Sequence, residues 1–216
     1  MSAFPHMLSR LQGSVSRKWD DAALWTMAGA LAAGDLKACD VMMGELGSPP
    51  PEMLWGPTLE TLPEPLLAFL LEWWNEARGA EFAPPVEVVD PFALRPALGH
   101  LSLLDVVDGG ADFRYRIHGS LTAARARWEW TGRRVSEIET PMRFFFLVNY
   151  RAVVRRRLPL FSTHTPPINV RMTAWHRLIL PLRRDDTVER LLVGILPTDR
   201  QDALADEDAP PPGRPT

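Results

Sequence analysis

Apolar and polar positions alternate along the second half of the chain with two different periods. Residues 101–118 predict an antiparallel hairpin, because a leucine- and valine-rich run leads through a DGG turn into a strand that alternates apolar residues with Arg114, Arg116 and His118. From about Met142 to Arg157 the apolar positions recur at helical spacing, and Pro159 ends this predicted helix. Three further strands are predicted within LPLFSTHTPP, INVRMTAWHRLILPL and VERLLVGILP.

The first half of the chain predicts three helices. One begins near Asp20 and ends at Gly34, and a second, with Asp35 as its cap, ends before the prolines of SPPPE. These two cannot enclose a core alone, so we expect them to pack on the main domain or on a partner. The third begins at Pro65 and is apolar around most of its circumference, which predicts burial on more than one side.

The order of these elements predicts an α+β fold. Two strands, several short helices, one longer helix and three strands are typical of a five-stranded antiparallel sheet with helices on one face, here preceded by an N-terminal helical extension. We divide the chain into a flexible lead (1–19), a helical extension with a Pro-rich linker (20–63), the sheet domain with its leading helix (64–198) and a disordered Pro-rich tail (199–216).

Composition narrows the environment and the partners. The 216 residues are 46% hydrophobic, which suffices to bury a core, and a net charge of −3 argues against nucleic acid as a partner. Cys39 is the one cysteine of the chain, which excludes an intrachain disulfide and fits a reducing compartment. No apolar run reaches the roughly 18 residues of a membrane span, and the N-terminus lacks a signal-peptide core. We therefore expect a cytoplasmic protein without a membrane partner.

The element order resembles that of the PAS fold, and local motifs extend the resemblance. These motifs are WWNEARG followed by Asp90-Pro91, LGHLSLLDVVDGGADFRYRIHGS, TGRRVSEI, YRAVVRRRLPLF and WHRLILPLRRDDTVERLLVGIL. Together, over about 66–197, they resemble a bacterial family of short, stand-alone PAS proteins. The chain departs from that family at His118, where an aliphatic residue is usual, and in the richness of tryptophan before TGR.

The resemblance implies a sensory or regulatory domain that binds a small ligand or cofactor between the sheet and the helices. It also implies a homodimer, signalling by a shift in helix packing, and a separate signalling protein as partner. One alternative is a ligand-free protein–protein adaptor that docks through the N-terminal helices. Another is a small-molecule enzyme on the same fold, although no nucleophile motif such as GxSxG is present and we predict no catalytic residue.

Aromatic residues, apolar residues and one histidine are the candidates for the wall of the ligand pocket. They are Tyr115, Ile117, Trp128, Trp130, Phe145, His176 and Leu178. His176 shares its strand phase with Leu178 and Leu180, which points it toward the interior, where a core histidine bonded to the backbone is the commoner role. We expect His118 on the solvent side or capping a helix.

The sequence does not identify a cofactor. Haem and non-covalently bound flavin both stay open, but Cys39 precedes the PAS-like segment, so a cysteine-linked flavin is not expected. The histidines lack the spacing of a metal site, and no metal ligand is predicted.

Overall fold

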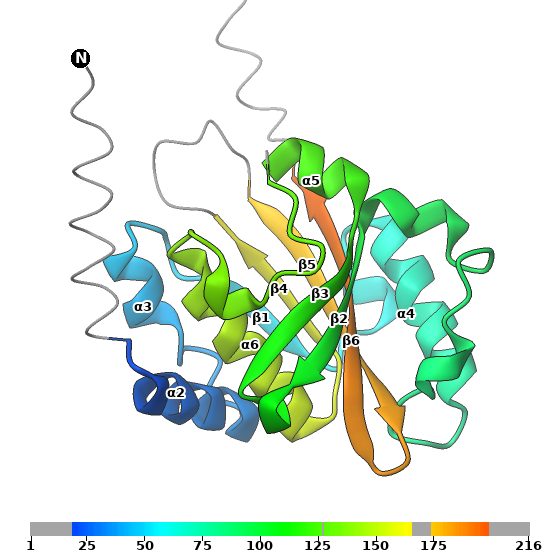
Figure 1. The fold of residues 1–216 in the computed structure, drawn as a ribbon, viewed down its shortest axis with the longest axis horizontal. Helices are drawn as coiled ribbons and strands as arrows, with labels where there is room; N and C mark the ends of the chain where they lie inside the picture. The colour runs from blue at the N-terminus through cyan, green and yellow to red at the C-terminus, as the bar shows by residue number, and fades with distance from the viewer. Residues whose placement is uncertain (1–18, 127, 166–173, 199–216) are drawn as a thin grey trace, which may run out of the picture.

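The computed structural model describes residues 19–126, 128–165 and 174–198. These residues form one antiparallel sheet with the strand order β1-β4-β5-β6-β2-β3 (Figure 1). Its strands are β1 (Glu52–Trp55), β2 (Leu101–Val107), β3 (Asp112–His118), β4 (Leu160–His164), β5 (Trp175–Arg184) and β6 (Thr187–Pro197). The predicted α+β class is confirmed. The sheet has six strands instead of five, because β1, which the sequence analysis missed, pairs with the edge of β4.

Helices cover both faces of the sheet, which corrects the prediction that they lie on one face (Figure 1). α4 (Pro65–Arg78) packs on one face, and α6 (Met142–Arg156) packs on the other. The prediction of a sheet covered on one face came from the arginines that alternate along β3. β3 is an edge strand, so its polar side does not represent the central strands. The central strands β5 and β6 carry apolar residues in both phases, so both faces of the sheet need a cover.

The predicted helix from about Met142 to Arg157 is confirmed, and it is the most deeply buried helix of the fold. α2 (Asp21–Ala33) packs against its outer side, so α6 lies between the sheet and α2 (Figure 1). The sheet, α6 and α2 therefore form a three-layer stack. α6 ends at Arg157, which has the left-handed conformation with a φ of 59°.

The N-terminal extension contributes to these layers. α2 begins at the cap residue Asp20, whose carboxylate accepts a hydrogen bond from the Ala23 amide, and it ends at Gly34. α3 (Asp40–Glu45) is shorter than predicted. Asp35 does not cap it, because its carboxylate accepts a hydrogen bond from the nearby Lys37 amide in a turn before α3.

α4 forms as predicted and fits closely against the central strands. It starts with Pro65 in its first turn and ends at Gly79. The indole Nε1 of Trp74 donates a hydrogen bond of 2.7 Å to the Pro181 carbonyl oxygen of β5. A side chain at Gly194 of β6 would collide with the Leu67 and Leu70 side chains of α4.

The predicted hairpin of β2 and β3 is confirmed. Asp108, Gly109 and Gly110 in its turn all have positive φ, which explains the DGG sequence. α5 (Ser120–Ala126) follows β3. The predicted lead and tail lie almost entirely outside the described residues, as does the predicted start of β5 at 168–173.

Candidate functional site

A cluster of aromatic and polar side chains lies between α6 and the sheet. Its ring centroids are 4.9–6.5 Å from those of their neighbours. All of its members except the half-buried Trp130 are buried. This α6 cluster consists of Tyr115, His118, Trp130, Phe146, Tyr150, His164 and Arg177.

A β-bulge in β3 brings His118 into the α6 cluster. Leu103 of β2 pairs with Ile117, but the next residue, Leu104, pairs with Tyr115, so Arg116 has no partner of its own. An extra residue reverses the two-residue alternation of a strand. Tyr115 and His118 are therefore both buried, with ring centroids 5.4 Å apart, whereas Ile117 is 48% exposed.

The TGR motif covers the free edge of β3. Thr131 Oγ1 accepts a hydrogen bond from the His118 amide, the Gly132 amide donates to the Tyr115 carbonyl oxygen, and the Tyr115 amide donates to the Arg133 carbonyl oxygen. These bonds satisfy backbone groups that an edge strand would otherwise expose. They also place Trp130, whose ring stacks on His118 with centroids 4.9 Å apart and an interplanar angle of 16°.

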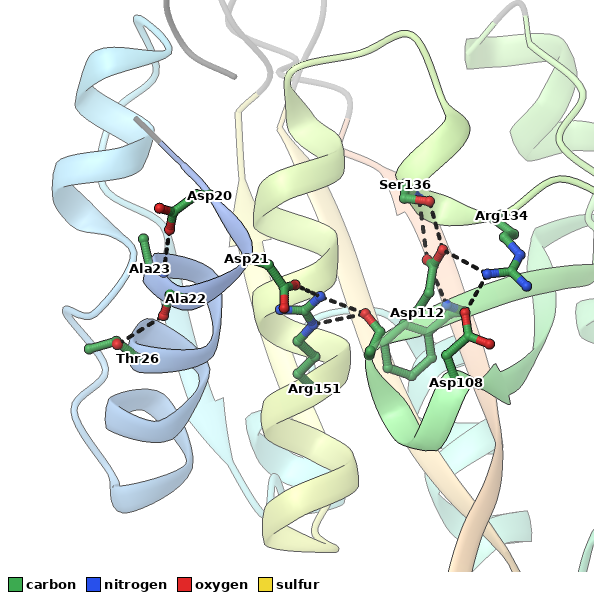
Figure 2. Close-up of polar contacts among 12 residues, drawn as sticks. Asp20, Asp21, Ala22, Ala23, Thr26, Asp108, Asp112, Arg134, Ser136 and Arg151 are labelled. Carbon is green, nitrogen blue, oxygen red and sulfur yellow. Dashed lines mark hydrogen bonds and ion pairs between the residues drawn. The ribbon is translucent and has the colours of Figure 1, made fainter. Parts of the chain in front are cut away.

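Asp112 fixes the next part of this segment to the start of β3 (Figure 2). Its carboxylate accepts hydrogen bonds from the Phe113 amide at 2.8 Å, the Ser136 amide at 3.3 Å and the Ser136 hydroxyl at 2.6 Å. Arg134 pairs with Asp108 in the hairpin turn and lies 3.9 Å from Asp112. The segment that carries Trp130 is thus attached to the hairpin through the TGR motif itself and through the residues that follow it.

α6 contributes to the site on its inner side and contacts α2 on its outer side. Phe146 and Tyr150 belong to the α6 cluster. Arg151 donates from Nη2 to a carboxylate oxygen of Asp21 in α2 and to the Ala111 carbonyl oxygen in the hairpin turn, both at 2.6 Å (Figure 2). Arg156 donates to the Ala32 carbonyl oxygen at the end of α2.

β4 and β5 bring polar side chains to the same layer. Ser162 lies directly opposite Arg177 in the antiparallel ladder, so the two share a face of the sheet. The Arg177 guanidinium carbon is 3.9 Å from the ring centroid of Phe146 and 5.6 Å from that of Tyr150. The His164 ring lies 5.1 Å from that of Phe145.

Many polar atoms in this layer are buried without a hydrogen-bond partner among the described residues. In native proteins such atoms are rare and each requires an explanation. They are both ring nitrogens of His118, His164 Nδ1, Ser162 Oγ, Nε and Nη1 of Arg177, and the hydroxyls of Tyr115 and Tyr150, which interact with each other but lack a well-formed hydrogen bond. Their concentration between one helix and one face of the sheet marks this layer as the candidate binding site.

Burial disfavours the charged forms of His164, His118 and Tyr115 in the α6 cluster. It holds the pKa of His164 well below its usual value, and Arg177 and His176 act in the same direction. Burial also lowers the pKa of His118, against the opposing effect of Glu129. The pKa of Tyr115 is raised well above its usual value by burial and then by Tyr150, while Arg177 acts to lower it. A site with one cationic guanidinium among neutral hydroxyls and imidazoles can bind a polar molecule with an anionic end.

The described residues contain no group of three or more His, Cys, Asp or Glu side chains that could hold a metal ion. His118 and His164 are the histidines of the α6 cluster, and each has a ring nitrogen that makes no hydrogen bond among the described residues, although His118 Nδ1 lies 3.7 Å from a Glu129 carboxylate oxygen. Cys39 lies before β1, and burial raises the pKa of its thiol to about 12, which leaves it unreactive at neutral pH.

The structure brings together only part of the predicted pocket. Tyr115 and Trp130 belong to the α6 cluster, and Phe145 adjoins it through His164. Ile117 and Trp128 are 48% and 59% exposed. His176 and Leu178 lie on the opposite face of the sheet: Leu178 packs in the core beneath α4, and His176 Nδ1 is 3.3 Å from a carboxylate oxygen of Glu64, the residue before α4.

Sequence reasoning missed the polar half of the site. It placed His118 on the solvent side or at a helix cap, and it gave Arg177 no role. The alternation along β5 did indicate that Arg177 is buried. Arg177 lies on the same side of the strand as the apolar residues Trp175 and Ile179, opposite the leucines. No local signal indicated the bulge that buries His118.

The fold and the site define an α+β protein with a buried, partly unsatisfied polar layer under its central helix. No family model matches the chain, and neither does any curated protein or any solved structure. Within residues 19–126, 128–165 and 174–198, no helix combines the length and the apolar character needed to cross a membrane.

Proposed function

We propose that this protein is a stand-alone PAS-type sensory or regulatory domain that binds a small molecule between its sheet and α6. The succession of β2, β3, the helical insert with α6, and β4, β5 and β6 supports the PAS-type interpretation. The observation that carries the binding proposal is the set of unpartnered polar atoms in the α6 cluster. A ligand there would supply the missing hydrogen bonds.

The position of α6 suggests how binding is signalled. Its inner side touches the proposed site, and its outer side is fixed to α2 by Arg151 and Arg156. A ligand that binds one packing of α6 better than another raises the population of that packing. α2 moves with α6 in this mechanism and presents the change to a second subunit or to a signalling protein.

The binding proposal is tested on the full-length protein as purified from cells. Native mass spectrometry compares the folded protein with the denatured chain, and an absorbance spectrum identifies haem or flavin. We expect a bound mass that Tyr115→Phe and His164→Gln reduce. The matched control is His176→Gln, on the other face of the sheet, which leaves the bound mass unchanged. If all three variants retain it equally, the molecule binds elsewhere and the proposed site is wrong.

The signalling proposal needs a separate measurement. Amide hydrogen exchange of α2 is compared between the loaded protein and the protein stripped by refolding. We expect slower exchange of α2 in the loaded form, and we expect Arg151→Met to remove most of the difference because it breaks the link from α6 to Asp21. An identical α2 pattern in both wild-type forms would exclude α2 as the output.

A further inference from the structure

The buried guanidinium of Arg177 restricts the chemistry of the ligand. Arg177 is 2% exposed, and its Nε and Nη1 have no hydrogen-bond partner among the described residues. No carboxylate of the described residues forms an ion pair with it. A buried charge without a partner is among the most costly groups in a protein interior. The contacts with Phe146 and Tyr150 offset only part of that cost.

We infer that the α6 cluster binds a small organic monocarboxylate, with Arg177 as its charge partner. This inference rests on the proposed function, because it names the class of molecule that occupies the proposed site. A planar guanidinium presents several donors to a carboxylate, and charge-assisted hydrogen bonds of this kind are the strong ones. The Tyr150 ring centroid lies 5.6 Å from the Arg177 guanidinium carbon. Ser162 is the cross-strand partner of Arg177, and its hydroxyl is buried without a hydrogen-bond partner among the described residues.

A single negative charge fits the site better than a phosphate. Arg177 is the one Arg or Lys of the α6 cluster, and burial lowers the pKa of both His118 and His164, which disfavours their cationic forms. A phosphate dianion would carry an unbalanced charge into this buried layer. The α6 cluster also contains the aromatic rings of Trp130 and Phe146, which suit an apolar or aromatic body attached to the carboxylate.

The chain itself contains one rival source of carboxylates. Residues 1–18 and 166–173, outside the described residues, contain neither Asp nor Glu. Residues 199–216 contain several acids, among them Asp202, Asp206, Glu207 and Asp208. If one of these paired with Arg177, small carboxylates would bind only to a full-length variant in which the tail acids are replaced by Asn and Gln. That result would overturn the inference.

The test compares acids with their neutral amides. Thermal unfolding of the stripped, full-length protein is followed with acetate, benzoate or phenylacetate, and with acetamide, benzamide or phenylacetamide at equal ionic strength. We expect at least one acid, best with an aromatic body, to raise the midpoint more than its amide does. This comparison needs no variant and does not depend on the folding of one.

Variants then locate the effect. We expect Arg177→Met to weaken binding of the stabilising acid by about 10- to 100-fold and Tyr150→Phe to weaken it less. Arg114→Met, which removes an exposed arginine of β3, is the matched control and leaves affinity unchanged. If Arg177→Met binds the acid as the wild type does, Arg177 is not the charge partner and the inference is wrong.

The two proposals fail in different ways. If the acids and the amides stabilise equally, or if a neutral molecule co-purifies, the carboxylate inference is wrong and the proposed binding function stands. The carboxylate inference is also wrong, and the binding function also stands, if none of the six compounds stabilises the protein but it carries a bound molecule that is not a carboxylic acid. If no compound stabilises it and nothing co-purifies, both proposals fail.

Discussion

The guanidinium carbon of Arg177 lies 3.9 Å from the centre of the Phe146 ring, in the buried layer between β5 and α6. This cation–π contact is worth about 0.5–2 kcal/mol. Desolvation of a guanidinium without a carboxylate partner costs more than that. Without a bound carboxylate the pair therefore should have a net cost in the folded protein, which is what the proposal that Arg177 is a binding residue requires.

Arg177→Met should consequently stabilise the ligand-free protein. Methionine is apolar, unbranched and flexible enough to occupy the volume beside Phe146. We expect the free energy of unfolding of the stripped protein to rise by about 1–3 kcal/mol, as found when buried charged residues are replaced by apolar ones. Urea denaturation measures the change, and Arg114→Met should stay within about 0.5 kcal/mol of the wild type. A clear loss of stability would mean that Arg177 has a partner within the folded chain.

Asp112 should be the polar residue whose loss most weakens the segment around the TGR motif. It is 7% exposed and accepts three hydrogen bonds, two of them from Ser136. Asp112→Ala leaves the Phe113 and Ser136 amides without this acceptor. We expect a loss of about 2–3 kcal/mol in urea denaturation, compared with about 1 kcal/mol for the matched variant Ser136→Ala. Equal losses would mean that the backbone bonds to Asp112 contribute nothing.

The elements with strong local patterns could be predicted from the sequence. α6, α4 and the β2–β3 hairpin formed where periodicity, proline and glycine placed them. β1 was missed because four residues in a Pro-rich segment carry no periodic signal, and their strand conformation depends on pairing with β4. The two-sided cover of the sheet was missed because it depends on which strands are central, and strand order is a non-local property.

The site was predictable only in its aromatic part. Tyr115 lies on the buried side of β3, as the alternation of its strand predicted, and its ring packs against that of Trp130. His118 and Ile117 exchanged their expected environments because one bulged residue, Arg116, reverses the alternation after it. The phase of His176 was correctly grouped with Leu178, but both faces of β5 are buried, so alternation alone could not say which face carries α6.

Gly194 should tolerate no side chain without a loss of stability. A Cβ built at this position of β6 would lie 2.6 Å from Leu70 Cδ1 and 2.8 Å from Leu67 Cδ2 of α4. We expect Gly194→Ala to destabilise the protein by about 1–3 kcal/mol as α4 shifts away from the sheet. The control is Gly44→Ala in α3, where a Cβ meets nothing within 4 Å. It should stabilise by about 0.5–1 kcal/mol, because alanine favours the helix. A neutral Gly194→Ala would contradict the close packing of α4 on β6.

The buried His164 should make the protein sensitive to acid. Burial holds the pKa of His164 in the folded protein well below 6.5, the usual value of the group, with Arg177 and His176 acting in the same direction. In the unfolded chain the same imidazole takes up its proton near pH 6.5. Below that pH the unfolded state therefore binds more protons than the folded state, and the free energy of unfolding falls as the pH decreases toward the folded pKa.

The loss that one such histidine causes is at most about 1.4 kcal/mol per pH unit, and it is absent above about pH 7.5. His164→Gln removes the titrating group, so we expect the variant to lose less stability than the wild type between about pH 7.5 and about pH 5.5, whatever its stability at neutral pH. Urea denaturation at both pH values measures the two losses. Arg114→Met removes no group that titrates in this pH range, so this control should leave the wild-type loss unchanged. Both variants retain every carboxylate that contributes to acid sensitivity. A loss of stability in His164→Gln as large as in the wild type would therefore show that His164 is already protonated, or solvated, in the folded protein.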